Sequence, residues 1–356
     1  MRTTTARLVA LGLILSACSV TAETAGTTTT TEPTPNSSTT STTAPPTTTT
    51  NVEVLETSLV NGLPVEDAEL LDRRLMAVKI DNHPKANPQS GIEQADMVIE
   101  LKVEGITRFL TFWHESDSEY LGPNRSGRPT DAAILAAFDE PTFVISGAQA
   151  WVQTLIRSKD VNLIKELSPG TFRIPERSAP HNLYVDTNIL RQTADDRGFS
   201  EAPPTGPLWE FGPMSEFAEP VSSVTMDFGS SDVIWEWKRF AKTWMRSAYG
   251  REGTYLDPDG EEQLVKVPVL IALYTDSYTA RPPAGVSGQA LPSSEVTGTG
   301  KAYVFADGRF TEGTWERESE DVWFSLVDAN GEMMLVPPGK SWVSLIPSQR
   351  GLTIEP

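Results

Sequence analysis

The sequence predicts an α+β protein, with an N-terminal α/β sandwich-type domain that has a mixed sheet, followed by a β-rich C-terminal domain. Between residues 75 and 200, apolar runs of strand length alternate with helical patterns, and this alternation is typical of an α/β sandwich. After a segment rich in proline and glycine at 202–220, short strand candidates succeed one another with turn residues between them. The second part is therefore expected to consist of β hairpins.

In the first part, one helix is marked by its cap. Thr130 and Asp131 are expected to begin a helix that reaches Phe138, because their side-chain oxygens can accept the free amides of a first turn. The expected strands are 75–80, 95–101, 106–113 and 143–146, and a second helix is expected at 148–157.

In the second part, turn signals separate the strands, and tryptophan is concentrated there. We expect the tryptophans to fill a β core; the alternative is a carbohydrate groove, since flat rings stack on sugars. The strand candidates are 221–228, 233–237, 242–246 and 253–256, and the tryptophans are Trp209, Trp235, Trp237, Trp244, Trp315, Trp323 and Trp342.

The N-terminal residues have the pattern of a secretory signal. Arg2 and Arg7 precede an apolar run at 8–15, which is too short for a membrane-spanning helix. The run ends in Leu-Ser-Ala-Cys and resembles the bacterial lipobox, which implies cleavage before Cys18 and a diacylglycerol on its thiol. We therefore expect a signal peptide at 1–17 and a lipid anchor on the extracytoplasmic face of the cell membrane. The alternative is an ordinary signal peptide with a buried thiol.

Residues 18–52 are expected to form a disordered tether. Between 19 and 50, 24 of 32 residues are Ser, Thr or Pro, so the segment has little apolar surface to offset its ordering entropy. The folded domains are then expected at 53–205 and 221–350. The formal net charge of -19 opposes binding to nucleic acid, so no nucleic-acid partner is expected.

The three histidines all lie in the first part, in polar surroundings: His83, His114 and His181. Histidine carries protons near neutral pH and binds metals. Their spacing is not that of a metal site, and the single cysteine offers no partner, so we expect neither a metal nor a cofactor. For each histidine taken alone, a structural hydrogen bond is the alternative to a place in a binding site.

Arginines accompany these histidines. Arg125 and Arg128 lie three apart in the loop 122–129, where they can present guanidinium forks and backbone amides to a phosphate or carboxylate. The alternative is that they form surface ion pairs with Asp117, Glu119 or Asp131. We expect an anion-binding cluster of His83, His114, His181, Arg108, Arg125 and Arg128 on one face, supported by Asp81, Asn82, Asp96, Asp131 and Asn182.

Long motifs in both parts carry a family resemblance. They include Lys-Ile-Asp-Asn-His-Pro-Lys-Ala at 79–86, Gly-Ile-Thr-Arg-Phe at 105–109, Ala-Pro-His-Asn-Leu-Tyr at 179–184 and Pro-Gly-Lys-Ser-Trp-Val at 338–343. With these motifs the chain resembles the YerB-like lipoproteins, a bacterial family described as a domain of unknown function with an N-terminal and a C-terminal part. The resemblance implies lipoprotein status and a two-part architecture, and it supplies no established activity.

A second likeness covers a shorter segment. A strand, Ala-Asp-Met-Val at 95–98, a turn, another strand and an arginine-bearing loop are similar to the LytR-CpsA-Psr enzymes. Those enzymes transfer glycopolymers from a polyprenyl diphosphate to the cell wall. By that analogy Arg125 and Arg128 would hold the diphosphate, and Asp96 would assist a metal or a base.

Three functions are consistent with these patterns. The first is a noncatalytic envelope lipoprotein that binds an anionic wall component or a partner protein through the histidine and arginine cluster. The second is an enzyme acting on phosphate-linked envelope glycans, in which arginine stabilises charge and His114 or His181 moves a proton. The third is a scaffold whose β domain docks another envelope protein.

Overall fold

The computed structural model describes residues 55–229 and 231–356. The expected signal peptide, Cys18 and the expected tether lie outside the described residues. No helix within the described ranges combines the length and the apolar character needed to cross a bilayer.

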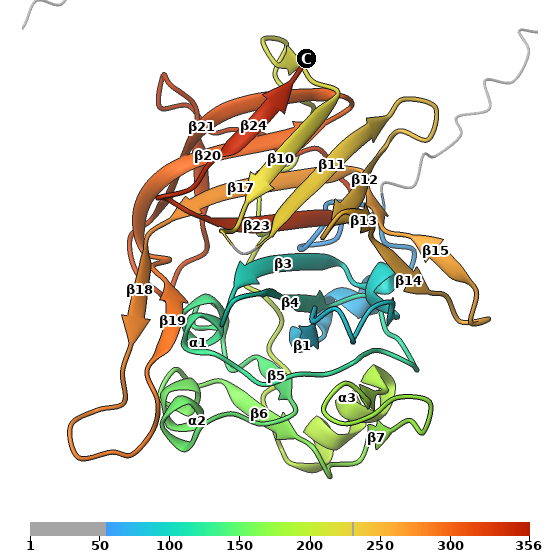
Figure 1. The fold of residues 1–356 in the computed structure, drawn as a ribbon, viewed down its shortest axis with the longest axis vertical. Helices are drawn as coiled ribbons and strands as arrows, with labels where there is room; N and C mark the ends of the chain where they lie inside the picture. Colours follow the sequence, from blue (N-terminus) through green and yellow to red (C-terminus); the bar gives the residue numbers. More distant parts are fainter. Residues whose placement is uncertain (1–54, 230) are drawn as a thin grey trace, which may run out of the picture. The chain divides into compact units, whose positions relative to one another are not determined.

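A large mixed sheet forms the centre of the fold (Figure 1), in the order β22-β21-β20-β17-β23-β3-β4-β1-β5-β6, with β9 added beside β21. Strand β1 is buried along its whole length, because apolar clusters cover both faces of the sheet. The strands of this sheet are β1 (Met76–Asp81), β3 (Met97–Lys102), β4 (Thr107–Trp113), β5 (Thr142–Ile145), β6 (Asn162–Lys165), β9 (Glu219–Pro220), β17 (Val269–Thr275), β20 (Gly298–Ala306), β21 (Arg309–Arg317), β22 (Ser325–Val327) and β23 (Ser341–Pro347).

Strands from both predicted parts join in this one sheet. Strand β23, from the C-terminal part, pairs in parallel with β3, from the N-terminal part, over five residue pairs that begin with Ser341 and Met97. The described chain groups into a single compact unit on the basis of its contacts. The boundaries expected at 205 and 221 therefore separate two sequence regions that share a sheet, and their status as domain boundaries stays a prediction.

A second, antiparallel sheet packs on the central one. Along β11 the buried residues Val233 and Trp235 alternate with the exposed Ile234 and Glu236, which is the pattern of a sheet with one solvated face. The Trp235 ring lies 5.3 Å from that of Trp342 on β23, so the tryptophan contributes to the core, as expected. The strands are β10 (Ser223–Asp227), β11 (Asp232–Lys238), β12 (Thr243–Ala248), β13 (Arg251–Glu252), β16 (Lys266–Val267) and β24 (Leu352–Glu355).

The remaining strands form three small sheets. The described helices come from the N-terminal part. Helices α1 and α2 lie side by side in Figure 1. The small sheets are β2 (Gln89–Ser90) with β14 (Thr254–Leu256) and β15 (Glu262–Leu264), β7 (Thr171–Arg173) with β8 (Leu183–Val185), and β18 (Ser277–Ala280) with β19 (Leu291–Ser294). The helices are α1 (Pro129–Leu135), α2 (Ala150–Arg157), α3 (Thr187–Asp196) and the short 3-10 turns η1 (Ala68–Asp72) and η2 (Ile92–Gln94).

The first helix begins one residue before the expected Thr130. Its N-cap is Arg128 and its first helical residue is Pro129, whose fixed φ suits that position. Asp131 still serves the cap, since its Oδ2 accepts the amide of Arg128 at 2.7 Å. The helix ends at Leu135, before the expected Phe138.

The sheet topology brings the site loops together. Strands β1 and β5 are parallel neighbours, so their carboxyl ends meet at one edge of the sheet, where ligands commonly bind in α/β folds. The arginine loop lies across this edge: the Arg125 amide donates to the Lys79 carbonyl at 2.7 Å, and the Ser146 amide donates to the Arg125 carbonyl at 3.0 Å.

Candidate functional site

A buried carboxylate organises the edge at the end of β1. The Oδ2 of Asp81 lies 2.7 Å from Nδ1 of His181 and 3.1 Å from Nε of Arg125, and its Oδ1 accepts the amide of His83 at 3.0 Å. The Asp81 side chain is fully buried, while the side chains of Arg125 and His181 are partly exposed. We call Asp81, His83, His181 and Arg125 the Asp81 site.

The two histidines of this site stack on each other. Their ring centroids are 4.7 Å apart, with an interplanar angle of 20°. Nδ1 of His83 accepts the amide of Lys85 at 3.1 Å, so in the neutral ring the proton is on Nε2. Desolvation, and then the neighbouring His181, lower the pKa of His83. His83 therefore presents a neutral ring that can donate one hydrogen bond through Nε2.

Arg125 is the available cation of the site. Its side chain is 23% exposed, and its two terminal nitrogens make no hydrogen bond to any residue that the structure describes. A guanidinium fork of this kind matches the geometry of a carboxylate or a phosphate. Arg125 and the stacked rings of His83 and His181 thus lie together around the Asp81 carboxylate.

Arg128 and Arg108 lie close by, but they are occupied by protein groups. Arg128 binds Glu104 with two hydrogen bonds, of 2.7 and 2.9 Å, and donates to the Gly127 carbonyl at 2.9 Å. Arg108 is nearly buried and donates to the Ser126 carbonyl at 3.1 Å. Burial, followed by the proximity of Arg128, lowers the pKa of Arg108 to about 10. Arg128 thus forms an ion pair, but its partner is Glu104 and none of the three acids expected for it.

This edge of the sheet carries an excess of one positive charge. Arg108, Arg125 and Arg128 form ion pairs there with only two acids, Asp81 and Glu104. This local excess lies in a chain whose net charge is -19. An anion close to Arg125 would gain more from direct contact than it loses to distant, screened acids.

Two of the expected supporting residues hold the framework. Asp131 forms a fully buried ion pair with Lys79, at 2.6 Å, and desolvation lowers the pKa of that lysine to about 8. Asn82 is buried and donates to Thr107 at 2.7 Å. Both side chains therefore position the ends of β1 and α1 and do not face a ligand.

Asn182 and Arg177 secure the loops around the histidines. The side-chain amide of Asn182 donates to the Ile174 carbonyl at 3.3 Å and its oxygen accepts a hydrogen bond from Arg173. Arg177 donates to the Ala86 carbonyl at 2.6 Å and also to the carbonyl of Pro88, which ties the loop after β1 to the segment that carries His181.

The expected convergence of all three histidines was wrong for His114. In the β1–β4 pairing, Asp81 is opposite Arg108, at the other end of β4 from Trp113. Six residues of extended chain place His114 about 20 Å from Arg108. His114 is fully buried there, and its ring nitrogen Nδ1 lies 3.1 Å from Glu115.

Asp96 accompanies His114 at that distant end and so also lies outside the Asp81 site. Its Oδ2 accepts the amides of His114, Glu115 and Ser116, at 2.7, 3.2 and 3.2 Å. Desolvation, and then the Glu115 carboxylate, raise the pKa of Asp96 to about 6. Its geometry indicates a structural role in closing the turn after β4. In the described part of the chain, no group of three or more potential ligands suits a metal ion.

Comparisons with known proteins place this architecture among proteins whose activity is not known. A family model described as "Protein of unknown function (DUF3048) N-terminal domain" matches residues 60–200, and the corresponding C-terminal domain model matches residues 224–343. "Putative lipoprotein YerB" of Bacillus subtilis (strain 168) is 26% identical over 308 residues, which cover 81% of this chain and 85% of that protein. The crystal structure of the YerB protein from Bacillus subtilis has a similar fold, with a TM-score of 0.71, 24% identity, and coverage of 84% of this chain and 99% of that one.

Proposed function

The chain belongs to the DUF3048 family of proteins of unknown function, and from this premise we propose that it is a lipid-anchored cell-envelope protein that binds a phosphate- or carboxylate-bearing ligand at the Asp81 site. The anchor would be a diacylglycerol on Cys18, in line with the name of the Bacillus subtilis relative. The ligand would be an anionic group of a wall polymer or of a partner protein in the envelope.

One observation carries the binding proposal. The terminal nitrogens of Arg125 make no hydrogen bond to a described residue, and its Nε lies 3.1 Å from the buried Asp81 carboxylate in an ion pair. Because this ion pair restrains the side chain and leaves the terminal nitrogens available, binding an anion there costs less side-chain entropy than binding to an unpaired arginine. His181 binds the same carboxylate through Nδ1, and the His83 ring stacks on the His181 ring beside it.

A second candidate function rests on His181. Its Nδ1 is 2.7 Å from a buried carboxylate, an arrangement that orients the ring and leaves Nε2 for proton transfer. On this hypothesis the protein would act on a phosphate-linked envelope glycan, with Arg125 stabilising charge and His181 moving the proton. Replacement of His181 by glutamine would then abolish turnover of such a glycan while anion binding through Arg125 persists.

Arg125→Gln tests the binding proposal. Calorimetry with inorganic pyrophosphate as the probe should show about 10-fold to 100-fold weaker binding, because a charge-assisted hydrogen bond contributes about 1.5–3 kcal/mol. The melting temperature should change by less than about 2 °C, because the buried Asp81 carboxylate keeps His181 and the His83 amide as partners when Arg125 is replaced.

The matched control is Arg157→Gln, which removes an exposed arginine at the end of α2. That variant should bind the probe like the unsubstituted protein. Equal binding by Arg125→Gln and the control would refute the proposal, as would a large drop in melting temperature, which would make Arg125 a structural residue.

A further inference from the structure

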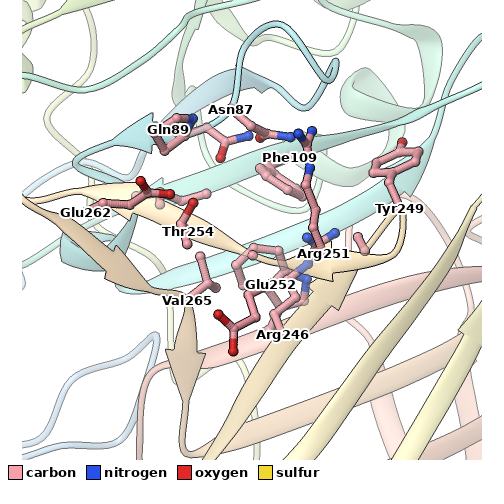
Figure 2. A pocket seen from close by; sticks show the side chains of 15 residues that line it. Asn87, Gln89, Phe109, Arg246, Tyr249, Arg251, Glu252, Thr254, Glu262 and Val265 are labelled. Atoms are coloured by element: carbon pink, nitrogen blue, oxygen red, sulfur yellow. The ribbon is translucent and has the colours of Figure 1, made fainter.

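A pocket of about 310 Å³ lies between the two predicted parts, apart from the Asp81 site. One wall comes from the loop after β1 and from β4, and the other from the segment that runs from β12 to β15 (Figure 2). Its volume is at the lower end of the range of about 300–1,000 Å³ that is typical of small-molecule sites. We call it the junction pocket.

The inner wall of the junction pocket holds a buried guanidinium. Arg246 is 5% exposed and binds Glu100 through Nη2 at 2.7 Å and through Nε at 3.4 Å. Its carbon Cζ lies 5.4 Å from the ring centroids of both Phe109 and Trp342. Its Nη1 makes no hydrogen bond to the described protein, so this neutralised ion pair still offers one donor to the pocket.

Gln89 supplies an acceptor on the same wall. Its side chain is almost buried, and its Nε2 donates to the Asp81 carbonyl at 3.0 Å and to Oδ1 of Asn82 at 3.3 Å. These two bonds fix the amide, and its Oε1 accepts no hydrogen bond from a described residue. An oriented acceptor and an oriented donor therefore face one small pocket.

Tyr249 adds a hydroxyl whose hydrogen bonding is unsatisfied. This residue occupies the turn between β12 and β13 with φ of 55°, a left-handed conformation that is strained for a bulky side chain. The hydroxyl is buried and has no hydrogen-bond partner among the described residues. A buried hydroxyl without a partner destabilises the folded protein, and a hydrogen bond from a ligand in the pocket would remove that cost.

The rim of the pocket carries polar side chains that have no hydrogen-bond partner among the described residues. In Figure 2, Arg251 extends across the pocket toward Asn87. Thr254 and Glu262 lie on the side of the pocket opposite Tyr249. None of these four side chains makes a hydrogen bond or ion pair within the described ranges of the chain. Since Glu252 also lines the rim, two acids and Arg251 stand there without a side-chain partner among the described residues.

We propose that the junction pocket binds a neutral saccharide of one or two units that carries hydroxyl and amide groups. The excess of one negative charge on the rim disfavours an anionic ligand, which separates this pocket from the Asp81 site. Fixed donors and acceptors beside Phe109 and Trp342 suit a ligand with many hydroxyls on an apolar ring skeleton. The inference is independent of anion binding through Arg125.

The test uses N,N′-diacetylchitobiose as the probe and the full chain in a detergent without a sugar headgroup. Calorimetry should detect binding to the unsubstituted protein, and Tyr249→Phe should bind at least about 5-fold more weakly, the worth of one hydrogen bond. The melting temperature of Tyr249→Phe should be equal or higher, because the hydroxyl removed has no protein partner. Thr254→Val provides a second variant and should also weaken binding.

Tyr278→Phe is the matched control, because this tyrosine is 45% exposed on β18 and does not line the junction pocket. Pyrophosphate binding should be unchanged in all three variants, which separates a failure here from a failure at the Asp81 site. The inference is overturned if the disaccharide does not bind, if neither pocket variant weakens its binding, or if a neutral dipeptide competes with it more strongly than cellobiose does.

Discussion

Replacing Glu100 with alanine is expected to lower the free energy of unfolding by about 3–5 kcal/mol, as found when one partner of a buried ion pair is removed. The Glu100 side chain is fully buried and pairs with Arg246 at 2.7 Å. It also accepts hydrogen bonds from Thr107 at 2.6 Å and from the indole of Trp342 at 2.9 Å. Without it, a guanidinium and two further donors would remain buried without an acceptor.

This network joins the two predicted parts, because Glu100 is on β3, Arg246 on β12 and Trp342 on β23. Urea denaturation followed by tryptophan fluorescence would measure the loss. Replacing both Glu100 and Arg246 with apolar residues of similar size should recover part of it, since no charge is then left unpaired.

The control for this prediction is Glu312→Ala. Glu312 forms an exposed pair with Lys301 at 3.2 Å, and exposed pairs contribute about 0–1 kcal/mol. A loss of less than about 1 kcal/mol for Glu100→Ala, indistinguishable from the control, would show that the network does not hold the two parts together.

Cys18→Ser is expected to move the protein from the membrane fraction to the soluble fraction. Each buried methylene of an acyl chain contributes about 0.8 kcal/mol, so two or more chains on one cysteine give stable anchoring, and all of this is lost with the thiol. After Cys18 the sequence contains no run of about 20 apolar residues. Fractionation followed by immunoblotting would measure the distribution.

Ser19→Ala is the matched control, because it changes the neighbouring residue and keeps the cysteine. That variant should remain in the membrane fraction. If Cys18→Ser stays with the membrane, and inhibition of the lipoprotein signal peptidase also leaves the distribution unchanged, the lipid anchor is not at this residue.

Local patterns predicted much of the secondary structure. The strands expected at 95–101 and 106–113 are confirmed as β3 and β4, and the hairpin strands at 233–237 and 242–246 as β11 and β12. Alternation and turn residues are local signals, so they can be read along a sequence. The parallel pairing of β23 with β3 joins segments more than 200 residues apart, and no local pattern encodes such a partner.

Strand pairing also decides which of the predicted residues come together in the site. Asp81, His83 and Arg125 were expected together and lie together, because β1 ends where the arginine loop crosses it. His114 has equally polar neighbours in the sequence, yet an antiparallel strand carries it to the opposite edge of the sheet. Polarity of neighbours indicates which residues can form a site, whereas strand direction decides which edge each residue reaches.

Nuclear magnetic resonance of the histidine rings, during titration with inorganic pyrophosphate, tests anion binding at the Asp81 site most directly. The chain has three histidines, so each ring resonance can be assigned by single replacement. His83 and His181 should shift together and saturate with one dissociation constant, and buried His114 should stay unchanged as an internal control. Shifts absent from His83 and His181, or equal for all three rings, would contradict an anion-binding site on this edge of the sheet.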